Sequence, residues 1–178
     1  MLFRSVDPAK KVILLTCHRR ENWGEPMERI FSAVAKIVDD HDDIEVVFPV
    51  HKNPKVREVA NRHLGGKNRV HMIEPLDYHP FSTLMSKAYL VLTDSGGIQE
   101  EAPSLGKPVL VLRDTTERPE AVAAGTVKLA GTYEEDILRE VETLLTDKNA
   151  YEAMAGTKNP YGDGTASCQI KEIIGENV

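Results

Sequence analysis

The turn at residues 94–97 combines the residue types that bind phosphate at the start of a helix. Asp94, Ser95, Gly96 and Gly97 follow a short apolar run and precede a helical pattern. Glycines let a phosphate approach the backbone, free N–H groups in a first helical turn bind anions, and the Ser95 hydroxyl adds a donor. The alternative is a plain N-cap, in which Asp94 or Ser95 caps the helix and glycine makes the turn. The turn contains neither a Walker motif nor a dinucleotide fingerprint.

Two carboxylates and an aromatic residue near this turn are of the types that bind the ribose and the base of a nucleotide. Glu100 and Glu101 follow one helical turn later, and a carboxylate there can accept hydrogen bonds from both ribose hydroxyls. The alternative is a solvated pair that complements the helix dipole. Phe81 can stack on a base, or it can pack in the core with Leu84 and Met85.

Two cationic candidates complete the set of residues that suggest chemistry. His18 follows an apolar run and is either a catalytic histidine or a loop histidine that caps the next helix. Arg118 precedes Pro119 at an expected helix start, where a positive charge is unfavourable unless an anion lies nearby. Arg118 therefore favours anion binding over a plain surface charge.

The elements that must position these residues alternate along the chain. Short runs rich in Val, Ile and Leu predict six strands, at residues 12–16, 44–50, 70–73, 89–93, 109–112 and 126–129. Continuous apolar runs of this length are typical of strands that are covered on both faces. Amphipathic helical patterns lie between them, at residues 27–38, 56–64 and 137–145. This alternation predicts an α/β fold with a doubly wound, Rossmann-like parallel sheet.

The predicted loops place most of the unusual polar residues at one edge of this sheet. Ligands bind beyond the carboxyl ends of the strands in open α/β sheets. The net charge of the chain is −6, yet the loops after the strands collect positive residues. These residues are His18, Arg19, Arg20, His51, Lys52, Arg113 and Arg118. An anionic small molecule is therefore the expected ligand.

Composition narrows the class of protein. The chain has 178 residues, which is enough for one hydrophobic core. Its acidic net charge disfavours binding to the phosphate backbone of a nucleic acid. No apolar run approaches the roughly 20 residues that span a bilayer, and no signal core precedes the first strand. Two cysteines, Cys17 and Cys168, provide neither a disulfide framework nor a zinc spacing. We expect a cytoplasmic protein that binds neither nucleic acid nor membrane, without a metal.

The C-terminal part differs from the rest. A short helix is expected near residues 149–155, and residues 159–164 break regular structure. Ile170, Ile173 and Ile174 then form a stripe too short for a stable isolated helix, so it is expected to dock on another surface. The chain thus divides into a lead-in over residues 1–11, a nucleotide-binding domain over 12–158 and a C-terminal crossover segment over 159–178.

Five motifs together resemble the non-hydrolysing UDP-N-acetylglucosamine 2-epimerases of bacteria. They are Thr-Cys-His-Arg-Arg-Glu-Asn at 16–22, Pro-Val-His-x-Asn-Pro at 49–54, Thr-Asp-Ser-Gly-Gly-Ile-Gln-Glu-Glu-Ala-Pro at 93–103, Thr-Thr-Glu-Arg-Pro-Glu at 115–120 and Asn-Pro-Tyr-Gly-Asp-Gly at 159–164. The resemblance covers the chain from about residue 12 to its end. It implies the C-terminal half of a GT-B enzyme, in which two Rossmann-like domains enclose the active site. Such an enzyme interconverts UDP-N-acetylglucosamine and UDP-N-acetylmannosamine by elimination and re-addition of UDP, without a cofactor.

The resemblance also implies roles for individual residues. The diphosphate is expected at Ser95, Gly96 and Gly97, the ribose at Glu101, and the uracil at Phe81 and the backbone of Leu76. Arg118 is expected to line the nucleotide pocket, and His18 matches the active-site histidine of the family. A second, regulatory UDP-sugar is expected at the positions of Arg19, Glu21 and His51.

One departure from the family is large. The Thr-x-His-Arg-Arg-Glu-Asn motif lies near the middle of the family's chains, whereas here it begins at Thr16. The family's N-terminal domain, which carries its catalytic carboxylates, has no counterpart in this sequence, so we expect this chain alone to be inactive. The resemblance separately implies that the parent enzyme is a homodimer. Three alternatives stay open: a hydrolysing epimerase, a GT-B glycosyltransferase, and a module that only binds UDP.

Overall fold

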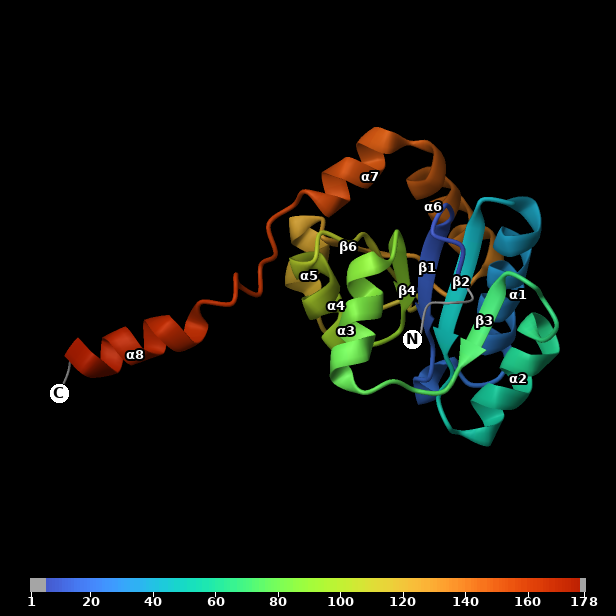
Figure 1. The fold of residues 1–178 in the computed structure, drawn as a ribbon, viewed down its shortest axis with the longest axis horizontal. Helices are drawn as coiled ribbons and strands as arrows, with labels where there is room; N and C mark the ends of the chain where they lie inside the picture. The colour runs from blue at the N-terminus through green and yellow to red at the C-terminus, as the bar shows by residue number, and fades with distance from the viewer. Residues whose placement is uncertain (1–5, 177–178) are drawn as a thin grey trace.

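The computed structural model describes residues 6–176, and its centre is one sheet of six parallel strands (Figure 1). The order across the sheet is β3-β2-β1-β4-β5-β6. The strands are β1 (Lys11–Thr16), β2 (Ile44–Pro49), β3 (Val70–Ile73), β4 (Leu90–Thr93), β5 (Val109–Val111) and β6 (Val127–Leu129). The predicted doubly wound sheet is confirmed, and each predicted strand agrees with the observed one to within a residue at either end.

The apolar runs form strands because both faces of the sheet are buried. In the centre, Ile13 lies opposite Val46 of β2 and Leu90 of β4. All three belong to one hydrophobic cluster, while the next residue, Leu14, belongs to the cluster on the opposite face. Successive side chains of a strand point to opposite faces, so a strand covered on both sides needs an apolar residue at every position.

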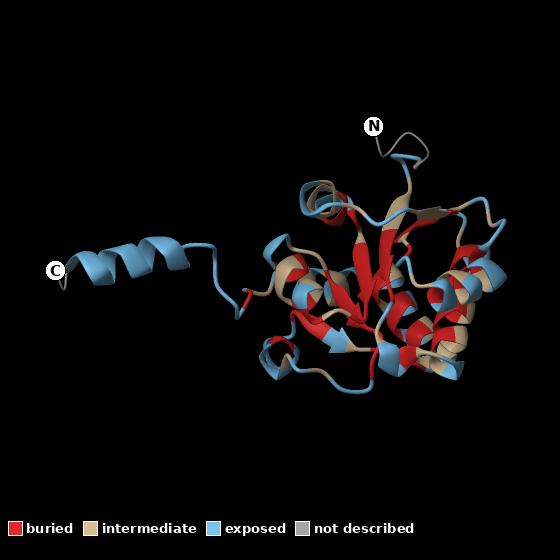
Figure 2. Ribbon diagram, turned by 90° about the horizontal axis from the view of Figure 1, so that it is seen from below, coloured by how far each residue is buried: buried red, intermediate tan, exposed pale blue. Residues whose placement is uncertain are grey.

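Helices cover the two faces in separate sets (Figures 1 and 2). The first cluster contains buried residues of α1 (Glu25–Asp40), α2 (Pro54–Leu64) and α6 (Glu134–Thr146). The second contains residues of α3 (Tyr78–Lys87), α4 (Gly96–Ser104) and α5 (Pro119–Ala124). The right-handed crossovers of a parallel sheet require this arrangement once the chain reverses its direction across the sheet.

Local signals explain where the first two helices begin. Gly24, with φ of 89°, is the N-cap of α1, and Pro26 lies in the first turn, where its missing N–H costs nothing. The N-cap of α2 is Asn53, whose Oδ1 accepts from the N–H of Lys55 at 3.0 Å. Pro54 follows at the first helical position. The loops after β1 and β2 end where these two helices begin, at the carboxyl edge of the sheet.

The C-terminal segment leaves the body of the molecule. Helix α7 (Lys148–Ala155) packs on the body, where Tyr151 stacks on Tyr89 with ring centroids 4.3 Å apart. Helix α8 (Ala166–Glu176) then extends away from the sheet and is exposed along its length (Figures 1 and 2). Ile170, Ile173 and Ile174 are 56%, 60% and 59% exposed, so the predicted stripe forms a helix whose isoleucines are more than half exposed.

The predicted division into three segments stays a prediction. Its first segment includes residues 1–5 and its last includes residues 177–178, all of which lie outside the described residues. Among residues 6–176, no helix has the length and apolar character needed to cross a membrane.

Candidate functional site

The site lies where the order of the strands reverses. Strands β1 and β4 are neighbours in the sheet, and the chain continues from β1 toward β2 on one side and from β4 toward β5 on the other. The loops that follow β1 and β4 therefore leave in opposite directions and form a crevice at the carboxyl edge. His18 lies in the first loop, and Ser95, Gly96 and Gly97 lie in the second.

Asp94 joins these two loops. Its side chain is fully buried, and Oδ2 accepts the backbone N–H groups of His18 and Arg19, each at 2.8 Å. The same oxygen accepts from Nδ2 of Asn22 at 3.1 Å, and Asn22 also donates to the carbonyl of Leu112 at the end of β5. The backbone of His18 is thus fixed to the end of β4.

The first turn of α4 is free of a side-chain cap. Ser95 occupies the N-cap position, but its hydroxyl makes no capping hydrogen bond, and Asp94 faces the loop after β1 instead. The plain-cap alternative is therefore wrong. Gly96 is buried, and a Cβ at this position would lie 2.5 Å from Oε1 of Glu117. At Gly97 a Cβ would meet nothing within 4 Å, which is consistent with a site open to a ligand.

A buried arginine organises a charged cluster beside this turn. Arg113 is 8% exposed and donates to the carboxylates of Glu21 and Glu117. Nη2 of Arg19 donates to Oε1 of Glu117 at 2.7 Å. The hydrogen bond from Arg113, together with the positive charges of Arg113 and Arg19, lowers the pKa of Glu117 to about 2. A carboxylate of the protein itself therefore lies against Gly96, next to the expected anion position.

A second ion pair holds Arg118. Its Nε donates to the carboxylate of Glu100, and its Nη1 donates to the carbonyl of Glu117 at 3.1 Å. Glu100 is therefore ion-paired, although its side chain is still 38% exposed to solvent. Arg19, Arg113 and Arg118 each pair with a carboxylate, so the positive charge of this edge is smaller than the sequence suggests.

A hollow of about 320 Å³ lies between α3, α4 and the C-terminal segment. Its lining includes Tyr78, Ser82, Glu101, Ser104 and Tyr161. Asn159 closes one side, because its Nδ2 donates to the carbonyl of Glu100 at 2.7 Å and to Oγ of Ser104 at 2.5 Å. Glu101 thus faces a hollow of sufficient size for part of a ribose, as its predicted role requires.

Phe81 and Leu76 lie on the α3 side of the site. Both are half-buried and pack against the core cluster under α3, α4 and α5. Phe81 lies in the first turn of α3 and packs partly on the core, whereas its stacking on a base stays a prediction.

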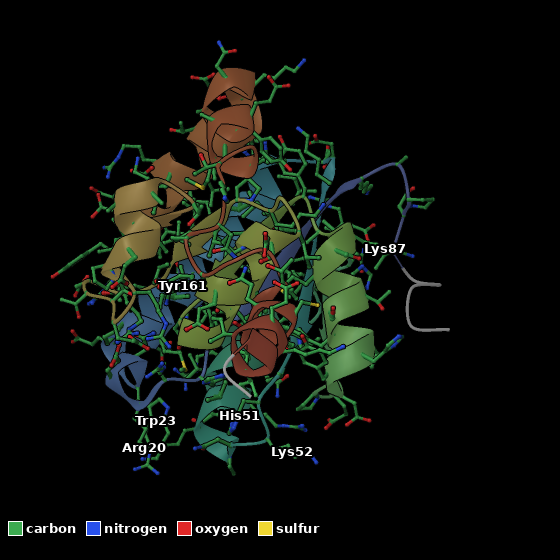
Figure 3. The ribbon with its side chains drawn as sticks, turned by 90° about the vertical axis from the view of Figure 1, so that its left-hand side faces the viewer. Arg20, Trp23, His51, Lys52, Lys87 and Tyr161 are labelled. Atoms are coloured by element: carbon green, nitrogen blue, oxygen red, sulfur yellow. The ribbon has the colours of Figure 1, made fainter. Side chains whose placement is uncertain are left out.

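His51 lies beside His18, so two predicted sites are contiguous. The centroids of the two rings are 5.4 Å apart, and Nδ1 of His51 accepts from the N–H of Asn53 at 3.1 Å. Figure 3 shows His51 and Lys52 at the same end of the molecule as Arg20 and Trp23. The remaining predicted regulatory residues, Arg19 and Glu21, belong to the charged cluster of Arg113.

Sequence reasoning missed the partners that hold the site together. Asp94 was considered only as a cap, and neither Glu117 nor Asn159 was singled out alone. The one available signal was an acidic residue directly after the buried strand β4, since such a group needs donors from another loop. Among residues 6–176 the structure contains no cluster of His, Cys, Asp and Glu that could hold a metal.

Comparison with known proteins identifies relatives of this chain. Residues 3–175 match the family described as UDP-N-acetylglucosamine 2-epimerase. The chain is 60% identical over 164 residues to the UDP-N-acetylglucosamine 2-epimerase of Bacillus subtilis, covering 92% of this chain and 43% of that protein. It is 58% identical over 172 residues to the enzyme of that name from Escherichia coli K12, covering 97% of this chain and 46% of the relative.

Solved structures show the same likeness. The S. aureus MnaA–UDP complex superposes with a TM-score of 0.91 at 52% identity, over 96% of this chain and 47% of that one. UDP-GlcNAc 2-epimerase from Neisseria meningitidis bound to UDP-GlcNAc superposes with a TM-score of 0.92 at 50% identity, over 98% of this chain and 47% of that one. The glycosyltransferase WaaG, at 18% identity and a TM-score of 0.71, shares the fold. The chain spans less than half the length of these epimerases, and it belongs to the UDP-N-acetylglucosamine 2-epimerase family.

Proposed function

We propose that this chain binds UDP as the nucleotide-binding half of a UDP-N-acetylglucosamine 2-epimerase. The observation that carries the proposal is the uncapped first turn of α4 beside the His18 loop at the strand reversal. Two relatives of the same fold are described as complexes with UDP and with UDP-GlcNAc, and this chain matches them over nearly its full length.

Each part of the nucleotide has a candidate contact. Ser95, Gly96 and Gly97 offer the N–H groups of the first turn of α4 to the diphosphate. Glu101 in the hollow accepts from the ribose hydroxyls, and Phe81 with the backbone of Leu76 holds the uracil. Arg118, oriented by Glu100, lines the pocket.

His18 is the candidate for chemistry at the leaving group. Its side chain is 40% exposed at the crevice, where it can reach a diphosphate bound to α4. Inversion at C2 of the sugar also needs groups that remove and return a proton on opposite faces. We assign these groups to the part of the whole enzyme that this chain does not span.

The proposal extends to regulation and assembly. Arg19, Glu21 and His51 would bind a second UDP-sugar beside His18, which requires Arg19 and Glu21 to exchange their contacts with Glu117 and Arg113. Following the resemblance, we propose that the whole enzyme is a cytoplasmic homodimer that serves polysaccharide biosynthesis.

Calorimetric titration of the folded chain with UDP tests the proposal. We expect binding weaker than in a two-domain enzyme, on the order of a thousandfold, because contacts from one side of the ligand are missing. Gly97→Ala should weaken binding at least about tenfold, since its Cβ meets no protein atom but would meet the diphosphate. Gly175→Ala in α8, where a Cβ also meets nothing, is the matched control. No heat with millimolar UDP would refute the site.

The remaining alternatives differ in product. With the whole enzyme, an epimerase forms UDP-N-acetylmannosamine, a hydrolysing epimerase releases N-acetylmannosamine and UDP, and a glycosyltransferase needs an acceptor. We expect the first outcome. The likeness to WaaG concerns the fold alone and does not favour transfer.

A further inference from the structure

The two carboxylate oxygens of Asp94 have different surroundings. Oδ2 receives three N–H donors, from His18, Arg19 and Asn22. Oδ1 is equally buried and has no hydrogen-bond partner among residues 6–176. A buried acceptor without a donor is destabilising, so such an atom needs an explanation.

The ring of His18 is a strong donor that lies near that oxygen. Nδ1 of His18 lies 3.9 Å from Oδ1, longer than a hydrogen bond. The other neighbour is the thiol of Cys17, which is a weak donor. Burial raises the pKa of Cys17 well above its usual value, and Asp94 raises it further, so this thiol stays neutral. Of these two neighbours, the histidine is the one that can donate a strong hydrogen bond to Oδ1.

We propose that Asp94 is a positioning residue for His18: Oδ1 accepts from Nδ1–H and directs Nε2 into the crevice. The inference deepens the proposed function and rests on it. The ring must approach by about 1 Å to form a hydrogen bond of normal length, and at 40% exposure it has room to do so. Catalytic hydrogen bonds are often long without ligand and shorten when it binds.

The backbone contacts make this arrangement specific. Because Oδ2 holds the N–H groups of His18 and Arg19, the same carboxylate fixes both the main chain and the ring of His18. The ring of His51 also packs beside that of His18, with the two centroids 5.4 Å apart. A fixed tautomer follows, with the proton on Nδ1 and the lone pair on Nε2 in the neutral ring.

The proposed tautomer defines one proton transfer in the elimination of UDP. When the C1–O bond of the sugar breaks, its electron pair stays on the diphosphate oxygen, and that oxygen takes the Nε2 proton of the cationic ring. The ring returns to the neutral Nδ1–H form facing Asp94, while the C2 proton leaves to a base outside this chain. In the re-addition the same proton returns to Nε2, so the ring is restored.

Ring ¹⁵N chemical shifts of His18 test the proposal, measured where the imidazole is neutral and assigned with His18→Gln. In the wild-type chain we expect Nδ1 to carry the proton. Asp94→Asn keeps the shape and an acceptor for the backbone N–H groups but presents an N–H to Nδ1, so the proton should move to Nε2. The ring of His51, whose Nδ1 accepts from the N–H of Asn53, should keep its tautomer in both.

The outcomes separate this inference from the proposed function. A wild-type His18 with its proton on Nε2, or one whose tautomer is unchanged in a folded Asp94→Asn, overturns the positioning role. If Asp94→Asn does not fold, the tautomer of His18 in the wild-type chain, measured without and with UDP, still tests the positioning role. Absence of UDP binding with the Nδ1–H tautomer present refutes the proposed function and leaves the contact between Asp94 and His18 intact.

Discussion

Nε of Arg118 donates to the side chain of Glu100, and the backbone carbonyl of the same glutamate accepts from Nδ2 of Asn159. Glu100 therefore connects the arginine of the nucleotide pocket to the C-terminal segment. Its neighbour Glu101 also lines the hollow between α3 and α4. The two adjacent glutamates therefore share the hollow, but Glu100 orients Arg118, whereas Glu101 is the residue to which we assign the ribose.

Glu101→Ala should weaken UDP binding much more than Glu100→Ala. Hydrogen bonds to a charged acceptor contribute roughly 1.5–3 kcal/mol each, so we expect a loss of about ten- to a hundredfold for Glu101→Ala. Titration of each variant with UDP and with 2′-deoxy-UDP measures the effect. Glu101→Ala should lose the discrimination between the two nucleotides, whereas Glu100→Ala should keep it, since it acts through Arg118. A wild-type chain that binds both equally would contradict the ribose assignment.

Glu117 should make stability depend on pH in the acid range. Its pKa is lowered from 4.5 to about 2 in the folded chain, so its contribution is present above pH of about 4.5 and is lost as pH falls toward about 2. Since 38% of the side chain is exposed, we expect only about 1 kcal/mol. Urea denaturation should show that Glu117→Gln is less stable than the wild type by this amount at neutral pH, and that the two are almost equally stable near pH of about 2.

A matched control for Glu117 lies on α2. Glu58 pairs with Arg62 at 3.1 Å, but its side chain is 74% exposed. An exposed pair of this kind contributes little, so Glu58→Gln should leave stability nearly unchanged at every pH. An equal, pH-independent loss in both variants would mean that the cluster of Arg113 does not set the pKa of Glu117.

The elements were predictable from the sequence, but the contacts between loops were not. The six strands follow from local apolar runs, because every position of a covered strand must be apolar. Asp94 is separated from His18 by 76 residues and from Asn22 by 72, so no local pattern reveals that they meet. The local pattern instead suggested a cap at Asp94, a role that the tertiary contacts override. Likewise, the local sequence around Arg113 and Glu117 does not predict that Arg113 also pairs with Glu21 in another loop.

Helix α8 should exchange its amide hydrogens rapidly in a dilute sample of the chain. Ile170, Ile173 and Ile174 are more than half exposed, and an isolated helix of 11 residues is marginal in water. Hydrogen exchange measured by mass spectrometry can compare α8 with α7, whose Tyr151 is stacked on Tyr89 and whose amides should be protected. Strong protection of α8 at low concentration would show that it packs on its own domain.

The chain alone should not epimerise UDP-N-acetylglucosamine at a measurable rate. In the proposed function the site binds the UDP part of the substrate and His18 assists its departure, but one ring cannot remove the C2 proton and return it on the other face. Loss of positioned acid–base groups typically costs about 100- to 10,000-fold each, and loss of orientation adds to this. Incubation in deuterated water, followed for exchange at C2 and for the manno product, measures the activity.

Addition of the part of the relatives that this chain does not span gives this last prediction its control. A separately expressed N-terminal half should restore turnover, because the two halves together complete the cleft. His18→Ala should then remove most of the restored activity, whereas Glu58→Gln, on the exposed surface of α2, should leave it unchanged. Exchange at C2 by the chain alone would contradict the division of labour, since it would require a base among the residues present here. Restoration that does not depend on His18 would contradict only the assignment of the leaving-group acid.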